Sequence, residues 1–125
     1  MTAKIINGTE IAKQIREELK QEIAELKAKH NVVPGLVTIL VGADPASQVY
    51  VGQKEKTAKE LGIYSERYDL PVTSTEKEII ALVKKLNANP KINGILCQLP
   101  LPKGLNEEPV IFCWIEFPFS FGMRR

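Results

Sequence analysis

The hydrophobic positions of the first quarter of the chain recur every three or four residues. From residue 8 to residue 30 this spacing places apolar side chains on one face of a helix, with Lys and Glu side chains opposite. The apolar face comprises Ile11, Ala12, Ile15, Leu19, Ile23 and Leu26. We expect Thr9 to cap the start of this helix, and Asn31 or Gly35 to close its end.

Two later segments are also predicted to be helical. The first runs over about 46–61 and ends at Gly62, a residue type that commonly follows a helix. The second runs over about 76–88, after Ser74 or Thr75 as its cap, and has a clear apolar face. That face is formed by Ile79, Ile80, Val83 and Leu86.

Three short apolar or β-branched runs alternate with these helices and are predicted to be strands. They cover residues 36–41, 64–70 and 94–98. Helices that alternate with buried strands indicate right-handed crossovers. We therefore predict a three-layer α/β domain, with a mostly parallel sheet and helices on both faces. In such a sheet, ligands bind at the carboxyl ends of the strands.

Three polar side chains lie near those predicted strand ends. Tyr50 and Lys54 are four residues apart, one turn along the same helix face, and Gln98 directly follows the apolar run Gly-Ile-Leu-Cys. One interpretation is a crevice where an aromatic ring holds a planar ligand beside an amine and an amide. The alternative is structural: a solvated Lys beside a packing Tyr, and an amide that satisfies backbone groups.

Composition and charge narrow the classes of function. With 125 residues, 44% of them hydrophobic and 26% charged, the chain is expected to form one soluble globular domain. The net charge of +2, without a basic stripe, argues against a nucleic-acid partner. No apolar run reaches the roughly 18 residues of a membrane span, and the first ten residues turn polar at once, so we expect neither a membrane span nor a secretory signal. Cys97 and Cys113 lack metal-ligand spacing, so we expect a reduced, cytoplasmic location and no metal.

The end of the chain differs from the rest in composition. All four Phe residues and the single Trp lie between residues 112 and 121. We therefore expect one domain over residues 1–108, followed by an atypical apolar tail over 109–125. Such an apolar stretch is costly to leave in water, so we expect it to fold back onto an uncovered face or to pair with another copy of the chain.

Two separated motifs resemble the signatures of the bifunctional methylenetetrahydrofolate dehydrogenase/cyclohydrolase family. The first runs from Val41 through Gly-Ala-Asp-Pro-Ala-Ser-Gln-Val-Tyr to Lys54, and the second is Gly94-Ile-Leu-Cys-Gln-Leu-Pro-Leu-Pro102. The resemblance extends over about residues 3–108. It implies a folate-binding catalytic domain from one-carbon metabolism.

The resemblance also implies roles for individual residues. Members of the family oxidise 5,10-methylenetetrahydrofolate with NADP or NAD and hydrolyse the methenyl product to 10-formyltetrahydrofolate. Tyr50 matches the tyrosine that stacks on the folate, Lys54 the catalytic lysine, and Gln98 the glutamine beside it. The same match places further substrate-binding positions at Val51, Gly52, Gln53, Cys97 and Leu99.

The sequence departs from the family after Glu108. No Asp follows Asp69, and neither a G-x-G-x-x-G nor a P-loop motif occurs in the 125 residues. We therefore expect an incomplete folate domain without a site for NADP or NAD, and no dehydrogenase activity from these residues alone. The competing hypotheses are a non-enzymatic folate-binding or interaction fragment on the same scaffold, and a product without function.

Overall fold

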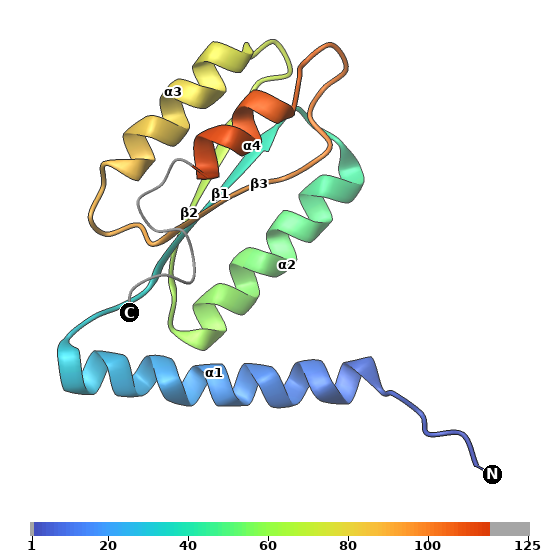
Figure 1. The fold of residues 1–125 in the computed structure, drawn as a ribbon, viewed down its shortest axis with the longest axis vertical. Helices are drawn as coiled ribbons and strands as arrows, with labels where there is room; N and C mark the ends of the chain where they lie inside the picture. The colour runs from blue at the N-terminus through green and yellow to red at the C-terminus, as the bar shows by residue number, and fades with distance from the viewer. Residues whose placement is uncertain (1, 116–125) are drawn as a thin grey trace.

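Three parallel strands form the centre of the fold (Figure 1). The computed structural model describes residues 2–115, with the backbone alone for residues 112–115. The strands are β1 (Gly35–Val41), β2 (Tyr64–Leu70) and β3 (Gly94–Cys97), in the spatial order β2-β1-β3. The three predicted strands are confirmed, although β3 ends one residue before the predicted boundary.

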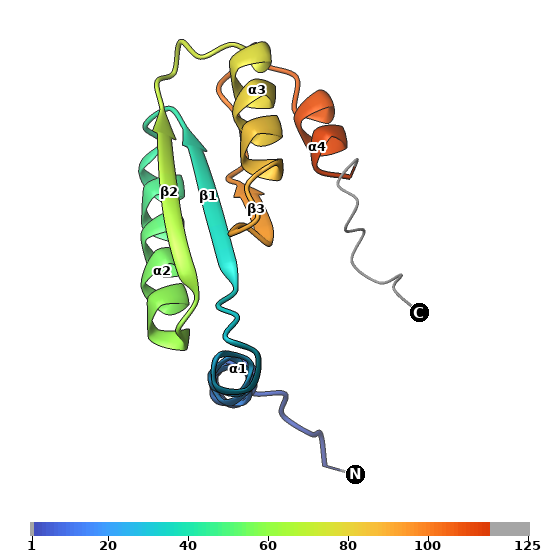
Figure 2. The same ribbon diagram turned by 90° about the vertical axis from the view of Figure 1, so that its left-hand side faces the viewer.

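The helices cover both faces of this sheet. Helix α2 (Pro45–Leu61) lies on one face, whereas α3 (Glu76–Asn87) and α4 (Glu108–Ile115) lie on the other (Figure 2). Helix α1 (Gly8–His30) runs across the end of the sheet where β1 begins (Figure 1). The prediction of a three-layer α/β domain is confirmed.

The helix ends follow local side-chain chemistry. The predicted cap at Thr9 is wrong, because the helix begins at Gly8 and the side chain of Asn7 accepts the N–H of Glu10 at 3.3 Å. Asn is as strong a cap as Thr and lies one residue outside the first turn, where its oxygen can reach the free N–H groups. At the other end Asn31 has the left-handed conformation, with φ 53°, as predicted. Thr75 caps α3 in a reciprocal arrangement with Glu78.

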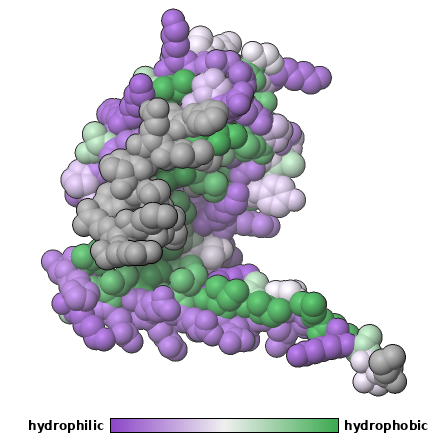
Figure 3. Space-filling model, in the orientation of Figure 1, coloured by the Kyte–Doolittle hydropathy of each residue, from purple (hydrophilic) through white to green (hydrophobic). Residues whose placement is uncertain are grey.

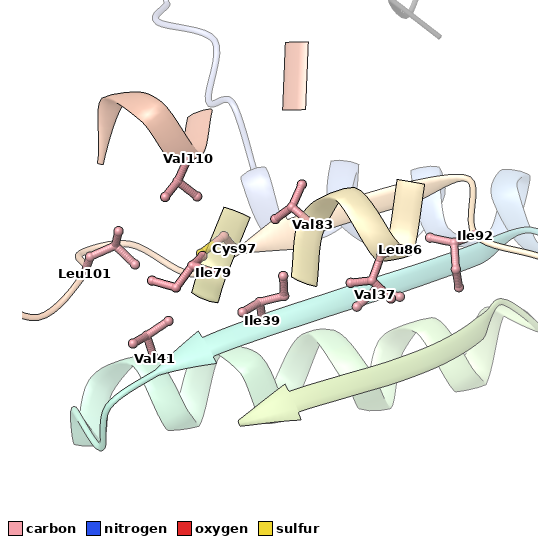
Figure 4. Close-up of a cluster of buried hydrophobic side chains, with 10 residues drawn as sticks. All are labelled: Val37, Ile39, Val41, Ile79, Val83, Leu86, Ile92, Cys97, Leu101 and Val110. Carbon is pink, nitrogen blue, oxygen red and sulfur yellow. The ribbon is translucent and has the colours of Figure 1, made fainter. Parts of the chain in front are cut away.

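The main hydrophobic cluster lies between the sheet and helices α3 and α4 (Figure 4). Alternate residues of β1 point into it, and one helical face of α3 packs against them. Its members are Val37, Ile39, Val41, Ile79, Val83, Leu86, Ile92, Cys97, Leu101 and Val110. On the α2 side of β1, Thr38 and Leu40 are buried and Leu36 is half-buried. Burial on both faces explains why the strand shows no alternation of apolar and polar residues.

Helix α1 buries little of its apolar face. Only Ile23 is buried among its residues. Ile11, Ile15 and Leu19 each keep 40% or more of their surface exposed, and Leu26 does the same. Figure 3 shows hydrophobic surface along this helix, above a hydrophilic underside. The predicted amphipathic pattern is therefore present, but within residues 2–115 its apolar side is mostly uncovered.

Helix α4 was not predicted. Its apolar sequence has no clear period and was assigned to an atypical tail. Pro109 lies in the first turn of the helix, where proline is tolerated. The predicted domain boundary after Glu108 falls at the first residue of this helix. Val110 has no exposed surface and joins the main cluster, so the start of the predicted tail packs on the domain. The rest of the predicted packing or self-association concerns residues 116–125, which lie outside the described part.

Two isoleucine truncations should separate the core from the exposed face of α1. Ile79→Ala removes a side chain with no exposed surface, so we expect a loss of about 2–5 kcal/mol in the free energy of unfolding. Ile15→Ala, at 48% exposure, should cost less than about 1 kcal/mol, since Ala also favours a helix. Urea denaturation of both variants measures the difference. Equal losses would show that α1 is packed more tightly than its exposure indicates.

Candidate functional site

Lys54 and Gln98 meet at the carboxyl end of the sheet. The Lys54 Nζ donates to the Gln98 Oε1 at 2.7 Å, although the two residues are 44 positions apart. Lys54 lies on α2, and Gln98 follows β3 directly. The backbone N–H of Gln98 donates to the carbonyl of Ile39 at 2.8 Å, which extends the β1–β3 pairing by one residue. The amide side chain therefore starts from a rigid part of the sheet.

A second hydrogen bond fixes the orientation of the Gln98 amide. Its Nε2 donates to the carbonyl oxygen of Leu99 at 2.9 Å, so its oxygen is the atom left to face Lys54. An ammonium group has three donors, and this contact uses one of them. The remaining N–H groups of Lys54 have no protein partner among the described residues. They can donate to a ligand.

The start of α2 sets the positions of Tyr50 and Lys54. Gly42 has φ +85°, a left-handed conformation that turns the chain at the end of β1. Asp44 then caps α2 by accepting the Ser47 N–H at 2.8 Å. This backbone hydrogen bond, followed by that of the Ser47 hydroxyl, holds the pKa of Asp44 below its usual value. The capped turn fixes where the helix begins and therefore which face carries Tyr50 and Lys54.

A pocket of about 430 Å³ lies beside the pair. Tyr50, Gln53 and Lys54 of α2 form one wall, Leu36 and Leu96 of the sheet line it as well, and α1 contributes Arg16. Tyr50 is 57% exposed, so its ring is free to take a planar ligand. The pocket thus combines apolar walls with an amine, an amide and a guanidinium group.

The other predicted substrate-binding residues lie in different surroundings. The side chains of Val51 and Cys97 are buried, with 0% and 2% exposure. Gly52 and Leu99 are half-buried, and Leu99 packs against the main cluster. The structure thus lines the pocket with Tyr50, Gln53 and Lys54, whereas Gln98 is joined to it only through its hydrogen bond to Lys54. Val51 and Cys97 are buried in the interior.

The sequence did not indicate the lining from Arg16, Leu36 and Leu96. The two leucines alternate with residues that face the main cluster, so strand periodicity was the available signal for them. No sequence pattern distinguishes Arg16 from the other charged residues of α1. Its place depends on how α1 packs near α2.

A larger hollow, of about 630 Å³, lies at the start of α3. It is lined by residues 72–77 and 103–105 and contains none of the predicted site residues. Tyr50 and Lys54 line the smaller pocket, so we place the candidate site there.

The start of α2, directly after β1, is not arranged to bind a phosphate group. A bound phosphate would need free N–H groups at the helix start after β1, but the Asp44 carboxylate already occupies that position and adds negative charge. No group of three or more His, Cys, Asp or Glu side chains in the described part is arranged to hold a metal ion. Nor is any of its helices long and apolar enough to cross a bilayer.

Comparison with known families gives a match over most of the chain. Residues 6–113 match the family described as tetrahydrofolate dehydrogenase/cyclohydrolase, catalytic domain. A bifunctional protein FolD from Dehalococcoides mccartyi is 55% identical over 111 residues, which are 89% of this chain and 38% of that protein. A FolD protein from Acetivibrio thermocellus is 52% identical over 112 residues, which are 90% of this chain and 39% of that protein.

Solved structures agree with these sequence matches. A 5,10-methylenetetrahydrofolate dehydrogenase from the silkworm Bombyx mori superimposes with a TM-score of 0.85 at 37% identity, covering 90% of this chain and 39% of that one. The Trypanosoma brucei dehydrogenase-cyclohydrolase, solved with NADP cofactor and an inhibitor, gives a TM-score of 0.83 at 33% identity. It covers 90% of this chain and 39% of that one. The chain thus spans less than two-fifths of the length of these relatives.

The thiol of Cys97 should be unreactive in the folded chain. Burial, and then the charge of Glu107, raise its pKa to about 11. At pH 8 the fraction present as thiolate is therefore about a hundredfold smaller than for a solvent-exposed cysteine. In a Cys113→Ser background we expect iodoacetamide labelling, followed by mass spectrometry, to be slow at pH 8 and to accelerate toward pH 11. The same variant in denaturant should label readily at pH 9. Fast labelling of the folded chain at pH 8 would contradict the buried placement.

Proposed function

The chain belongs to the tetrahydrofolate dehydrogenase/cyclohydrolase family, and we propose from this that its crevice binds a tetrahydrofolate derivative and supplies proton-transfer groups for reactions of its one-carbon unit. The observation that carries the proposal is the 2.7 Å contact between Lys54 and Gln98 beside the exposed ring of Tyr50. The ring offers a flat surface for a pterin, and the amine lies one helical turn away.

The hydrolytic reaction fits these groups most directly. Water adds to the carbon that joins N5 and N10 of 5,10-methenyltetrahydrofolate, and the bond from that carbon to N5 then breaks to give 10-formyltetrahydrofolate. The attacking water loses both of its protons, one as it adds to the cationic methenyl carbon and one as its hydroxyl becomes the formyl carbonyl. N5 takes one proton as it departs, and the other is released to the solvent. We assign this exchange to the Lys54 amine, because a positioned amine can accept a proton from water and return it. Gln98 orients the amine and adds no charge.

The oxidative reaction of the family requires NADP or NAD, which accepts a hydride from the methylene carbon. The Trypanosoma brucei relative is described as complexed with NADP. Because Asp44 blocks the helix start after β1, we assign no step of that reaction to a dinucleotide bound by these residues. Their part is to bind and orient the folate. Hydrolysis consumes only water, so it tests the crevice without a cofactor.

The composition supports a small-molecule role inside the cell. A net charge of +2 without a basic stripe favours a small ligand over nucleic acid. The thiol of Cys97 is free and buried among apolar side chains, which agrees with a reducing cytoplasm. We therefore propose a cytoplasmic folate-binding catalytic domain that does not associate with membranes.

Replacement of Lys54 should remove hydrolysis. We expect Lys54→Met to lower the rate for 5,10-methenyltetrahydrofolate by about 10²–10⁴-fold, the usual contribution of acid–base catalysis. The matched control is Lys56→Met on the same helix, whose side chain is 78% exposed and does not line the pocket. Both rates are followed by the disappearance of the methenyl compound, corrected for uncatalysed hydrolysis. Hydrolysis that survives Lys54→Met would refute the assigned role.

Tyr50 should contribute to binding through its ring and not through its hydroxyl. We expect Tyr50→Ala to weaken binding of 5-formyltetrahydrofolate by about 3–10-fold, and Tyr50→Phe to bind like the parent chain. Isothermal titration calorimetry measures both. Binding without any hydrolysis would favour the alternative of a non-enzymatic folate-binding module, whereas equal losses in both variants would point to the hydroxyl.

A further inference from the structure

A short segment between β3 and α4 holds the Gln98 side chain in place. This segment, residues 98–102, contains two prolines, Pro100 and Pro102, which have no N–H to donate. Leu101 lies between them and is 7% exposed, so its N–H is a buried donor that needs an acceptor. Few hydrogen bonds are therefore available to hold residues 98–102 in place.

The acceptor comes from a side chain and not from the backbone. The Leu101 N–H donates to the Oε1 of Glu107 at 2.9 Å. Glu107 is half-buried and precedes α4, and its carbonyl accepts the N–H of Ile111 at 3.0 Å in the first turn. The neighbouring Val110 has no exposed surface and anchors that turn in the main cluster. The carboxylate is therefore held by a helix that is itself packed on the core.

The Glu107 carboxylate also lies close to the end of β3. Its charge contributes, after burial, to the raised pKa of Cys97, the last residue of that strand. Glu107 directly precedes α4, whereas Lys54 lies on α2, and these two helices cover opposite faces of the sheet (Figure 2). Glu107 thus supports residues 98–102 from the α4 side of the sheet, without contacting the Lys54 amine.

We propose, on the basis of the proposed function, that Glu107 is a positioning residue. By accepting the Leu101 N–H it fixes residues 98–102, and this holds the Gln98 amide against Lys54. The chain of contacts is continuous. Glu107 fixes Leu101, the Leu99 carbonyl two residues earlier accepts the Gln98 Nε2, and the Gln98 Oε1 accepts the Lys54 Nζ. A shift of the segment would misdirect the amide oxygen, and small misplacements of catalytic groups are costly in rate.

Three variants test this assignment in the full chain. Glu107→Ala removes the acceptor, Glu107→Gln keeps an oxygen at the same reach without the charge, and Glu108→Ala removes a neighbouring exposed carboxylate as a control. We expect Glu107→Ala to lower kcat for methenyl hydrolysis by about 10–100-fold with little change in KM, whereas the other two variants stay close to the parent. Melting temperatures recorded for all three separate this effect from a general loss of stability.

A second readout is independent of activity. In NMR spectra of the parent chain we expect cross-peaks between the Gln98 side-chain amide protons and the Lys54 methylene next to Nζ. These should be lost in Glu107→Ala and kept in Glu107→Gln. If no chain hydrolyses the substrate but the cross-peaks follow this pattern, the proposed function fails and the positioning role stands.

Two results would overturn the positioning role. One is a Glu107→Ala chain that keeps both the cross-peaks and the rate. The other is a Glu107→Gln chain that loses as much as Glu107→Ala, because the acceptor oxygen would then not be the cause. If Glu107→Ala does not fold, Glu107→Asp carries the test, since it keeps the charge but shortens the reach by one methylene. It should then show the same selective loss in kcat and in the cross-peaks.

Discussion

The burial of β1 between its two neighbours is the constraint on which the rest of the structure depends. This strand pairs with β2 on one side and β3 on the other, and six of its seven residues are buried. Alternate side chains enter the main cluster against α3 and α4, while the others meet α2. The Ile39 carbonyl also accepts the N–H of Gln98. The strand that organises the core therefore also fixes the position of the candidate site.

Much of the fold could be predicted from periodicity, because β1 and α3 bury most of the apolar residues that define their patterns. Of the four residues predicted for the apolar face of α3, Ile79, Val83 and Leu86 are buried and Ile80 is half-buried. Helix α4 was missed because its sequence is apolar on every side, so no period distinguishes the face that carries Val110. The exposure of α1 could not be predicted either. An amphipathic pattern shows that a helix has an apolar face, but not what covers that face.

The candidate site was predictable to the extent that it lies where parallel strands end. Tyr50, Lys54 and Gln98 followed from that rule together with the family motifs. In the structure Tyr50 and Lys54 line one pocket, and Gln98 is hydrogen-bonded to Lys54. A hydrogen bond between a side chain and the backbone of another segment produces no pattern in the sequence. The bond from Leu101 to Glu107 depends on where α4 begins, and α4 was itself not predicted. Arg16 reaches the pocket only because of the angle at which α1 crosses the domain.

The choice of an amide as the partner of Lys54 has a chemical consequence. A carboxylate at that position would hold the ammonium form as an ion pair and would oppose the release of its proton. An amide oxygen accepts a hydrogen bond from the ammonium and from the neutral amine alike, so it directs the nitrogen in both states. The Glu107 carboxylate instead accepts the backbone N–H of Leu101. A charged group thus accepts a backbone N–H and a neutral group faces the amine, an arrangement that suits the proton exchange we propose for Lys54.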